Sequence, residues 1–285
     1  MEKSACRFDL HIHSTASDGT DSPEVLLENI KSAGIGIFAL TDHDTINGVL
    51  EMQKIVPDDI AFIKGIEFSC KTEAGKCHIL GYNYDENAPE FKAIIEEGKE
   101  KRRRKLDSRI EFLKDNFGIV FSKNELSELY SMNSVGKPHI GNLLVAKGFA
   151  DNRNEAIEKY INPCKTESDR LDGKAAVEAI LASGGIPVWA HPLGGTGEKL
   201  LTDEQFADQL ALLKSTGLKG LECFYSRYDE KQIQFLLETA EKNGLFTSGG
   251  SDYHGTNKTV RLGQLNALGK VITSEMITLL QSITK

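Results

Sequence analysis

The chain has 285 residues, of which 40% are hydrophobic and 27% are charged, as in a soluble globular protein with one large domain or one domain and an insertion. The formal net charge of −8 excludes a protein that coats nucleic acid through a basic surface, although bound metal cations can still attract an anionic substrate. No apolar run approaches the length of about 18 residues that a membrane span needs, and no apolar signal-peptide core follows the amino terminus.

The amino-terminal third alternates short apolar strands with amphipathic helices. We predict strands over residues 8–12, 35–40, 61–66 and 78–82, and helices over residues 23–33 and 49–55 between the first three strands. Continuous apolar strands joined by helices are typical of a parallel sheet that helices cover on its outer side.

Metal-binding residue types stand beside these strands. His11 and His13 share one face of the first strand, because positions i and i+2 point to the same side. His43 follows the second strand, Glu67 follows the third, and His78 lies on the fourth. The carboxyl ends of the strands are where βα barrels assemble their chemistry, so this pattern favours such a barrel.

The pattern changes between residues 91 and 166. Apolar residues recur there at helical spacing from residue 94 to residue 113, and further short helices are predicted over residues 125–129, 140–147 and 154–161. We interpret this region as a helical insertion, or cap. The expected division is therefore a first barrel part (1–90), the insertion (91–166) and a second barrel part (167–285).

The barrel pattern resumes after the insertion. We predict helices over residues 173–182, 206–213 and 229–241, and strands over residues 185–190, 218–224 and 245–251. His191 follows the first of these strands. Asp252 and His254 follow the last one, and by the i, i+2 rule we expect them to share one strand face.

Six of the seven histidines thus lie at or beside strand ends. With three carboxylates they form a set of nine candidate ligands: His11, His13, Asp18, His43, Glu67, His78, His191, Asp252 and His254. Zinc takes about four ligands and manganese or iron about six, so nine ligands predict two or three divalent ions that share a carboxylate. Imidazole and carboxylate without thiolate leave manganese, zinc and iron open. Ions about 3.5–4 Å apart supply a nucleophilic hydroxide and clamp a phosphoryl group.

These motifs closely resemble those of the PHP (polymerase and histidinol phosphatase) family of phosphoesterases. The matching segments are His11-Ile12-His13, Thr41-Asp42-His43-Asp44, Glu67, His78-Ile79-Leu80-Gly81, Ala190-His191-Pro192 and Gly250-Ser251-Asp252-Tyr253-His254, in family order over essentially the whole chain. The insertion resembles that of the TrpH-like branch, which comprises nucleoside 3′,5′-bisphosphate phosphatases and 5′–3′ exonucleases of short RNA. The resemblance implies an α/β fold: a distorted, TIM-like βα barrel with a small helical insertion.

The resemblance also implies three ion positions. One ion would be held by His11, His13, Glu67 and Asp252, a second by Glu67, His78 and His191, and a third by Asp18, His43 and His254. Glu67 would bridge the first two. Many relatives have His at the position of Asp18, and the harder oxygen ligand favours manganese over zinc in this chain.

Candidate substrate contacts are Lys137, His139, Arg102 and Arg227. Lys137 and His139 belong to a Lys-Pro-His motif that resembles the Arg-Pro-His of the TrpH-like branch, and phosphate oxygens need such donors. Arg102 stands in the basic run over residues 99–105, near the apolar stripe of its helix, and Arg227 follows the strand over residues 218–224. We expect Asp42 and Asp44 to orient ligand histidines.

The expected function is a metal-dependent phosphoesterase acting on nucleoside 3′,5′-bisphosphates or short 5′-phosphorylated oligonucleotides, by attack of a metal-bridging hydroxide. One alternative is a histidinol-phosphate phosphatase, against which the insertion and its Lys-Pro-His argue. Another is an amidohydrolase, in which a carboxylated lysine commonly takes the bridging place of Glu67. A third is a non-catalytic metal-binding PHP module, against which the filled ligand set argues.

The sequence further predicts partners and location. We expect a phosphorylated nucleotide or short oligonucleotide as the partner, with no membrane and no obligate protein partner. The five cysteines are scattered, odd in number and without a Cys-x-x-Cys motif, which favours reduced thiols in the cytoplasm over a disulfide framework.

Overall fold

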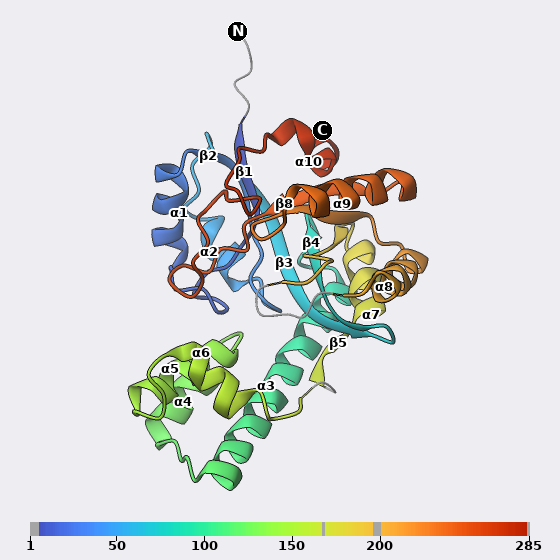
Figure 1. Cartoon of the computed structure of the whole chain (residues 1–285). Helices are drawn as coiled ribbons and strands as arrows, with labels where there is room; N and C mark the ends of the chain where they lie inside the picture. The colour runs from blue at the N-terminus through green and yellow to red at the C-terminus, as the bar shows by residue number, and fades with distance from the viewer. Residues whose placement is uncertain (1–5, 167–168, 196–200, 284–285) are drawn as a thin grey trace.

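The structure, a computed structural model, describes residues 6–166, 169–195 and 201–283. A strongly curved sheet forms a nearly closed barrel with helices outside it, and a long helix leads from the barrel to a separate group of helices (Figure 1). The α/β barrel with a helical insertion, expected from the resemblance, is confirmed. No helix among the described residues has the length and apolar character that crossing a membrane requires.

Seven strands follow one another around the barrel in the order β1-β2-β3-β4-β6-β7-β8, and the short β5 pairs with β3. Their bounds are β1 (Arg7–Ile12), β2 (Ile35–Leu40), β3 (Ala61–Thr72), β4 (Gly75–Tyr82), β5 (Leu171–Asp172), β6 (Ile186–Trp189), β7 (Gly220–Tyr225) and β8 (Phe246–Gly250). The ring closes where the N–H of Asp252 donates to the carbonyl of His11 and the N–H of His13 donates to that of Tyr253.

The helices outside the barrel are α1 (Pro23–Ser32), α2 (Asn47–Met52), α7 (Gly173–Ala182), α8 (Asp203–Ser215), α9 (Glu230–Asn243) and α10 (Thr278–Ile283). Capping residues mark the starts of two of them. Ser22 caps α1 by accepting from the N–H of Val25, with Pro23 in the first turn, and Asp229 forms a capping box with Gln232 at α9. Their apolar faces pack on the sheet and bury its outer side.

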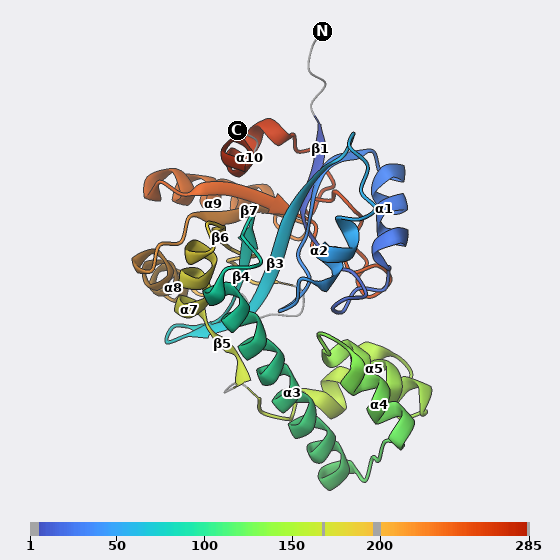
Figure 2. The ribbon, with the colours of Figure 1, turned by 180° about the vertical axis from the view of Figure 1, so that it is seen from behind.

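The insertion starts on α3 (Pro89–Phe117) and continues through α4 (Lys123–Ser131), α5 (Lys137–Ala146), α6 (Arg153–Ala156) and a π-helical turn (Ile157–Ile161). The first turns of α3 belong to the barrel core through Phe91 and Ile94, whereas Leu106 and Leu113 belong to a second hydrophobic cluster with the shorter helices. Figure 2 shows α3 as the connection between the two bodies. We propose that residues 91–166 form one cap, which is anchored in the barrel core by the start of α3 and has its own core from Leu106 onward.

Three local expectations were wrong. The third strand does not stop at Glu67 but continues to Thr72, because a hairpin turn at Gly75 folds β4 back antiparallel to it. The sheet is therefore mixed, since β4 is antiparallel to β3 and also to β6. Asp252 and His254 share no strand face, because β8 ends at Gly250 and Asp252 has a left-handed φ of 59°.

Candidate metal centre

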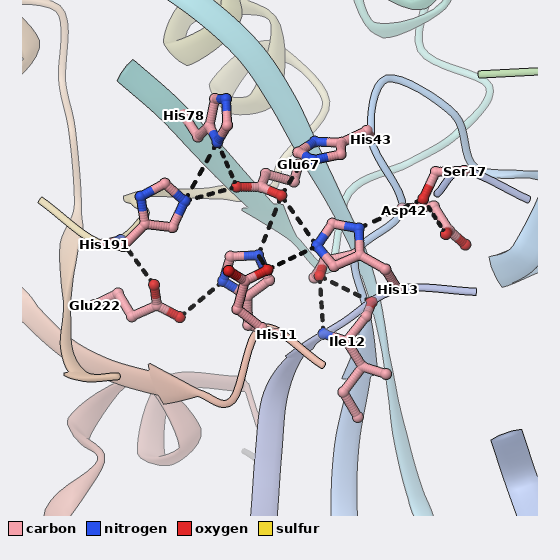
Figure 3. Close-up of polar contacts among 12 residues, drawn as sticks. His11, Ile12, His13, Ser17, Asp42, His43, Glu67, His78, His191 and Glu222 are labelled. Atoms are coloured by element: carbon pink, nitrogen blue, oxygen red, sulfur yellow. Dashed lines mark hydrogen bonds and ion pairs between the residues drawn. The ribbon is translucent and has the colours of Figure 1, made fainter. Parts of the chain in front are cut away.

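The nine predicted ligands lie together at one end of the barrel. Figure 3 shows six of them: His11, His13, His43, Glu67, His78 and His191. His11 is on β1, Glu67 on β3 and His78 on β4, and the other six are on the loops that follow β1, β2, β6 and β8. Gly250 makes the close packing possible, because a Cβ at this position would collide with His11. We call these nine residues the donor cluster.

Glu67 is the centre of the donor cluster. Its Oε2 lies 3.1 Å from Nε2 of His11, 3.1 Å from Nε2 of His13 and 3.1 Å from Nδ1 of His43. Its Oε1 lies 2.9 Å from Nδ1 of His78 and 3.1 Å from Nε2 of His191. The two carboxylate oxygens thus face two different groups of imidazoles, which is the arrangement of a bridging carboxylate.

Two further carboxylates complete the donor cluster. Oδ1 of Asp252 lies 3.7 Å from Nε2 of His11 and 3.5 Å from Nε2 of His13. Oδ1 of Asp18 lies 3.3 Å from Nε2 of His254 and 4.0 Å from Nε2 of His43. Ligand atoms within 4.8 Å of one another form three overlapping groups: His11, His13, Glu67 and Asp252; His13, Asp18, His43 and His254; and His43, Glu67 and His78.

The chemistry of these atoms fits divalent metal ions. Five buried atoms that face the centre of the donor cluster have no hydrogen-bond partner: Nε2 of His11, Nε2 of His13, Oδ1 of Asp18, Nδ1 of His43 and Oε2 of Glu67. Buried polar atoms are normally paired, because leaving one unpaired costs about 1–3 kcal/mol. Divalent cations would satisfy all five at once, and imidazole with carboxylate suits zinc, manganese and iron.

The electrostatics of the donor cluster agree with this fit. Burial alone would raise the pKa of Glu67, but His43, His11 and His78 hold it well below its usual range. The pKa of Asp252 is likewise held low, chiefly by Lys258 and His254 against the effect of burial. Both carboxyl groups are therefore ionised at neutral pH, which is the form that binds metal.

Glu222, on β7, supports the donor cluster from behind and was missed by the sequence reasoning. Its carboxylate accepts hydrogen bonds from Nδ1 of His11 at 2.9 Å and from the N–H of His191 at 2.7 Å (Figure 3). The sequence could have identified Glu222, because it is a charged residue in the middle of the apolar strand Gly220–Tyr225. A fully buried carboxylate needs partners, and here the partners are two predicted ligands.

Asp42 and Asp44, which were expected to orient ligand histidines, differ in their hydrogen bonds. Asp42 accepts from the N–H and hydroxyl of Ser14 and from the hydroxyl of Ser17, which lies 3.4 Å from Nδ1 of His13. Asp44 accepts from the N–H of Ser69 and from Arg102. Asp42 therefore reaches a ligand histidine, His13, through Ser17, whereas these bonds of Asp44 lead to Ser69 and Arg102.

A cleft of about 300 Å³ lies between the donor cluster and the insertion. Two of the predicted substrate contacts, Arg102 and Lys137, line it. Arg102 donates to Asp44 at 2.6 Å and to the hydroxyl of Ser69 at 3.0 Å, and Lys137 donates to Asn162 at 2.6 Å.

The other two predicted contacts are not among the described residues that line the cleft. Nδ1 of His139 accepts from the N–H of Gly136, at the start of α5, and burial lowers the pKa of this histidine. Arg227 donates to the carbonyl of Gly195, which does line the cleft.

Sequence reasoning missed four cations that line the cleft: Lys105, Arg109, Arg170 and Lys258. Lys258 donates to Oδ2 of Asp252 in the donor cluster. We call the other three the cation wall. Lys105 and Arg109 follow Arg102 at helical spacing on α3, so the helix period was a usable signal. Arg170 stands before β5, and its Nη1 lies 3.4 Å from Nε2 of His78.

The described residues that line the cleft include no carboxylate outside the donor cluster that could balance the charge of the cation wall. Burial, together with Arg102 and Arg170, lowers the pKa of Lys105 to about 7. Burial and the same two arginines lower the pKa of Arg109 to about 10. Arg109 is only 7% exposed, and its Nε has no hydrogen-bond partner. Among the described residues that line the cleft, the carboxylates are Asp18, Glu67 and Asp252, which all belong to the donor cluster.

Comparison with known proteins places this geometry among phosphoesterases. The profile of the PHP domain matches residues 9–165. A 5′–3′ exoribonuclease of Haemophilus influenzae is 32% identical over 90% of this chain and 93% of its own length. A phosphoribosyl 1,2-cyclic phosphate 1,2-diphosphodiesterase of Eggerthella lenta is 29% identical, over 87% and 94% of the two chains. A 3′,5′-nucleoside bisphosphate phosphatase of Chromobacterium violaceum is 28% identical, over 87% of each.

A solved structure shares the fold. It is a candidate metal-dependent phosphoesterase from Bifidobacterium adolescentis that superimposes with a TM-score of 0.78 at 27% identity, over 94% of this chain and 95% of its own. The barrel and the insertion are therefore shared across nearly the whole length of both chains.

Proposed function

This chain belongs to the PHP domain family, and on that premise we propose that it is a metal-dependent phosphoesterase whose substrates carry two phosphate groups. The proposed substrates are nucleoside 3′,5′-bisphosphates and short 5′-phosphorylated RNA. The observation that carries the proposal is the two-sided cleft, which has metal ligands on one side and the cation wall on the other.

The donor cluster is proposed to hold two or three divalent ions, of manganese, zinc or iron, with Glu67 as the bridging ligand. When bound, such ions activate water as a nucleophile and stabilise charge on a phosphoryl group. The chain supplies the rest. Nδ1 of His11 is held by Glu222, which leaves Nε2 directed at the centre of the donor cluster.

The cation wall supports a second phosphate. Lys105, Arg109 and Arg170 repel one another, and a phosphate dianion between them would relieve that repulsion and supply oxygen acceptors. One phosphate anchored there would present the other to the donor cluster in a fixed orientation. Tyr225 and Lys258, which both donate to Oδ2 of Asp252, would keep that ligand in place.

The names of the relatives point to the same substrate chemistry. The bisphosphate phosphatase and the cyclic phosphate diphosphodiesterase are both named for a sugar that carries two phosphate groups, and RNA carries one phosphate per nucleotide. A histidinol-phosphate phosphatase would leave the cation wall without a ligand, because its substrate has a single phosphate. A non-catalytic module would need neither the cation wall nor the cleft.

A substrate panel tests the proposal. Phosphate release and product formation would be measured with Mn²⁺ for a nucleoside 3′,5′-bisphosphate, a 5′-phosphorylated RNA dinucleotide, phosphoribosyl 1,2-cyclic phosphate and histidinol phosphate. We expect turnover of the first two and its loss in His191→Ala. Preference for the cyclic phosphate would still mean a substrate with two phosphate groups, but a different one from those proposed. Turnover of histidinol phosphate alone would refute the proposal.

A further inference from the structure

A second cavity, of about 440 Å³, adjoins the cleft at His78 and His191. Lys137 and Arg170 also line both cavities, so the cleft and the second cavity share a wall, and we call them the first and second lobes of one site. We propose that this second lobe binds the nucleoside that follows the scissile phosphate of an RNA substrate. The inference rests on the proposed function, because it assumes that the phosphate to be cleaved lies at the donor cluster.

The walls of the second lobe have the chemistry of a nucleoside site. The half-buried Leu201 offers apolar surface to a base, and the exposed Lys76 and Gln205 offer polar groups. Trp189 and Pro192 also belong to the lining, but both are buried. None of the described residues that line this lobe is acidic. The volume lies within the range of about 300–1,000 Å³ that small-molecule sites occupy.

The position of the second lobe follows from the bond that is cleaved. In both a 3′,5′-bisphosphate and 5′-phosphorylated RNA, hydrolysis breaks the bond between phosphorus and O3′ of the first nucleotide. The oxygen of water bonds to phosphorus, O3′ takes up a proton, and the phosphate leaves either as inorganic phosphate or as the 5′-phosphate of the next nucleoside. Only the RNA substrate carries a group beyond that phosphate.

The geometry separates the two ends of such a substrate. Lys105 and Arg109 line the first lobe but are absent from the described lining of the second, and His78 and His191 of the donor cluster stand between. A 5′-phosphate on the cation wall and a 3′-phosphate at the donor cluster direct any further nucleoside into the second lobe. This lobe therefore distinguishes exonuclease activity from phosphatase activity in one site.

The test uses a variant that adds negative charge to the second lobe only, Lys76→Glu combined with Gln205→Glu. Both changes preserve the fold. Lys76 is an exposed hairpin residue directly opposite Lys71, so its replacement removes a like-charge pair. Gln205 is the side-chain partner of Thr202 in the capping box of α8, and glutamate serves there equally well. The matched control is Lys231→Glu, a charge reversal at an exposed site in the first turn of α9.

Both variants and the wild type would be assayed with Mn²⁺ on a nucleoside 3′,5′-bisphosphate and on the dinucleotide and trinucleotide of 5′-phosphorylated RNA. We expect the double variant to lower kcat/KM for both RNAs by about tenfold or more, the effect of one lost ionic contact, with less than about a twofold change for the bisphosphate. The bisphosphate activity serves as the control for folding and metal content.

Two outcomes would overturn the inference while leaving the proposed function intact: equal losses on the bisphosphate and the RNAs, or no loss on the RNAs. A wild type that hydrolyses the bisphosphate but no RNA would overturn the inference and also remove RNA from the proposed substrates. If the wild type hydrolyses none of the three substrates, the proposed function fails, and the inference fails with it.

Discussion

Nδ1 of His11 donates a hydrogen bond of 2.9 Å to the carboxylate of Glu222. The bond joins β1 to β7 across the interior of the barrel, where both side chains are fully buried. It fixes the proton of the imidazole on Nδ1, so that Nε2 faces Glu67 with its lone pair available to a metal. The same carboxylate also holds the backbone of His191, so one residue orients two predicted ligands.

The first prediction concerns this support. Glu222→Gln keeps the shape of the side chain but removes its charge. The new amide N–H group would also face either Nδ1 of His11 or the N–H of His191, both of which are donors. We expect Mn²⁺ affinity to fall by about 10- to 100-fold, the usual effect of losing a residue that orients a ligand. Isothermal titration calorimetry would measure it, with Glu230→Gln on the surface of α9 as the control. Equal affinities in the two variants would contradict the role given to Glu222.

The second prediction is that metal binding releases protons. Asp252 and Glu67 outweigh the effect of burial and raise the pKa of His13 to about 9 in the metal-free protein. His13 is therefore protonated at pH 7 and must lose its proton to bind metal, so affinity should rise with pH up to about 9. The expected slope is about tenfold per pH unit for each proton displaced. Calorimetry in two buffers of different ionisation enthalpy would count the protons, and a count of zero would refute the prediction.

The third prediction concerns the cation wall. The pKa of Lys105, lowered to about 7, means that the lysine loses its charge as pH rises from 7 to 9, while a phosphate monoester with a pKa near 6 stays a dianion. We therefore expect KM for the bisphosphate to rise over this range in the wild type. In Lys105→Met, KM should be higher at pH 7 and should depend less on pH. Parallel slopes of log KM against pH in the two proteins would exclude a role for Lys105 in binding.

The sequence predicted the donor cluster better than its surroundings, and the reason is physical. Histidines and carboxylates beside the ends of neighbouring strands must meet, because a closed sheet brings those ends to one rim. The reversal of β4 depends on the turn at Gly75, and strand periodicity is the same in either direction. The helix period places Lys105 and Arg109 on the same side of α3 as Arg102, but the packing of α3 against the barrel decides whether that side faces the cleft.

The fourth prediction separates a structural from a substrate-binding role for Arg102. Its ion pair with Asp44 is nearly buried, with 11% and 3% of the two side chains exposed, and a third bond reaches the carbonyl of Val135 in the insertion. Arg102→Met leaves Asp44 as a buried charge, so we expect a loss of about 3 kcal/mol and a Tm lower by several degrees. Adding Asp44→Asn should recover part of that loss. If KM in the double variant equals the wild-type value, Arg102 holds the insertion to the barrel rather than the substrate.

The last prediction concerns the choice of metal. Asp18 contributes an oxygen to the group that it forms with His13, His43 and His254. Carboxylate oxygen is a harder ligand than imidazole, so the wild type should take up manganese relative to zinc more readily than an Asp18→His variant. Metal analysis of both proteins from the same unsupplemented growth would measure the ratio. A control with Asp21→His, at a partly exposed position on the same loop, would show whether an added histidine alone recruits zinc. If the ratio of manganese to zinc is the same in the wild type and in Asp18→His, Asp18 does not set the metal preference.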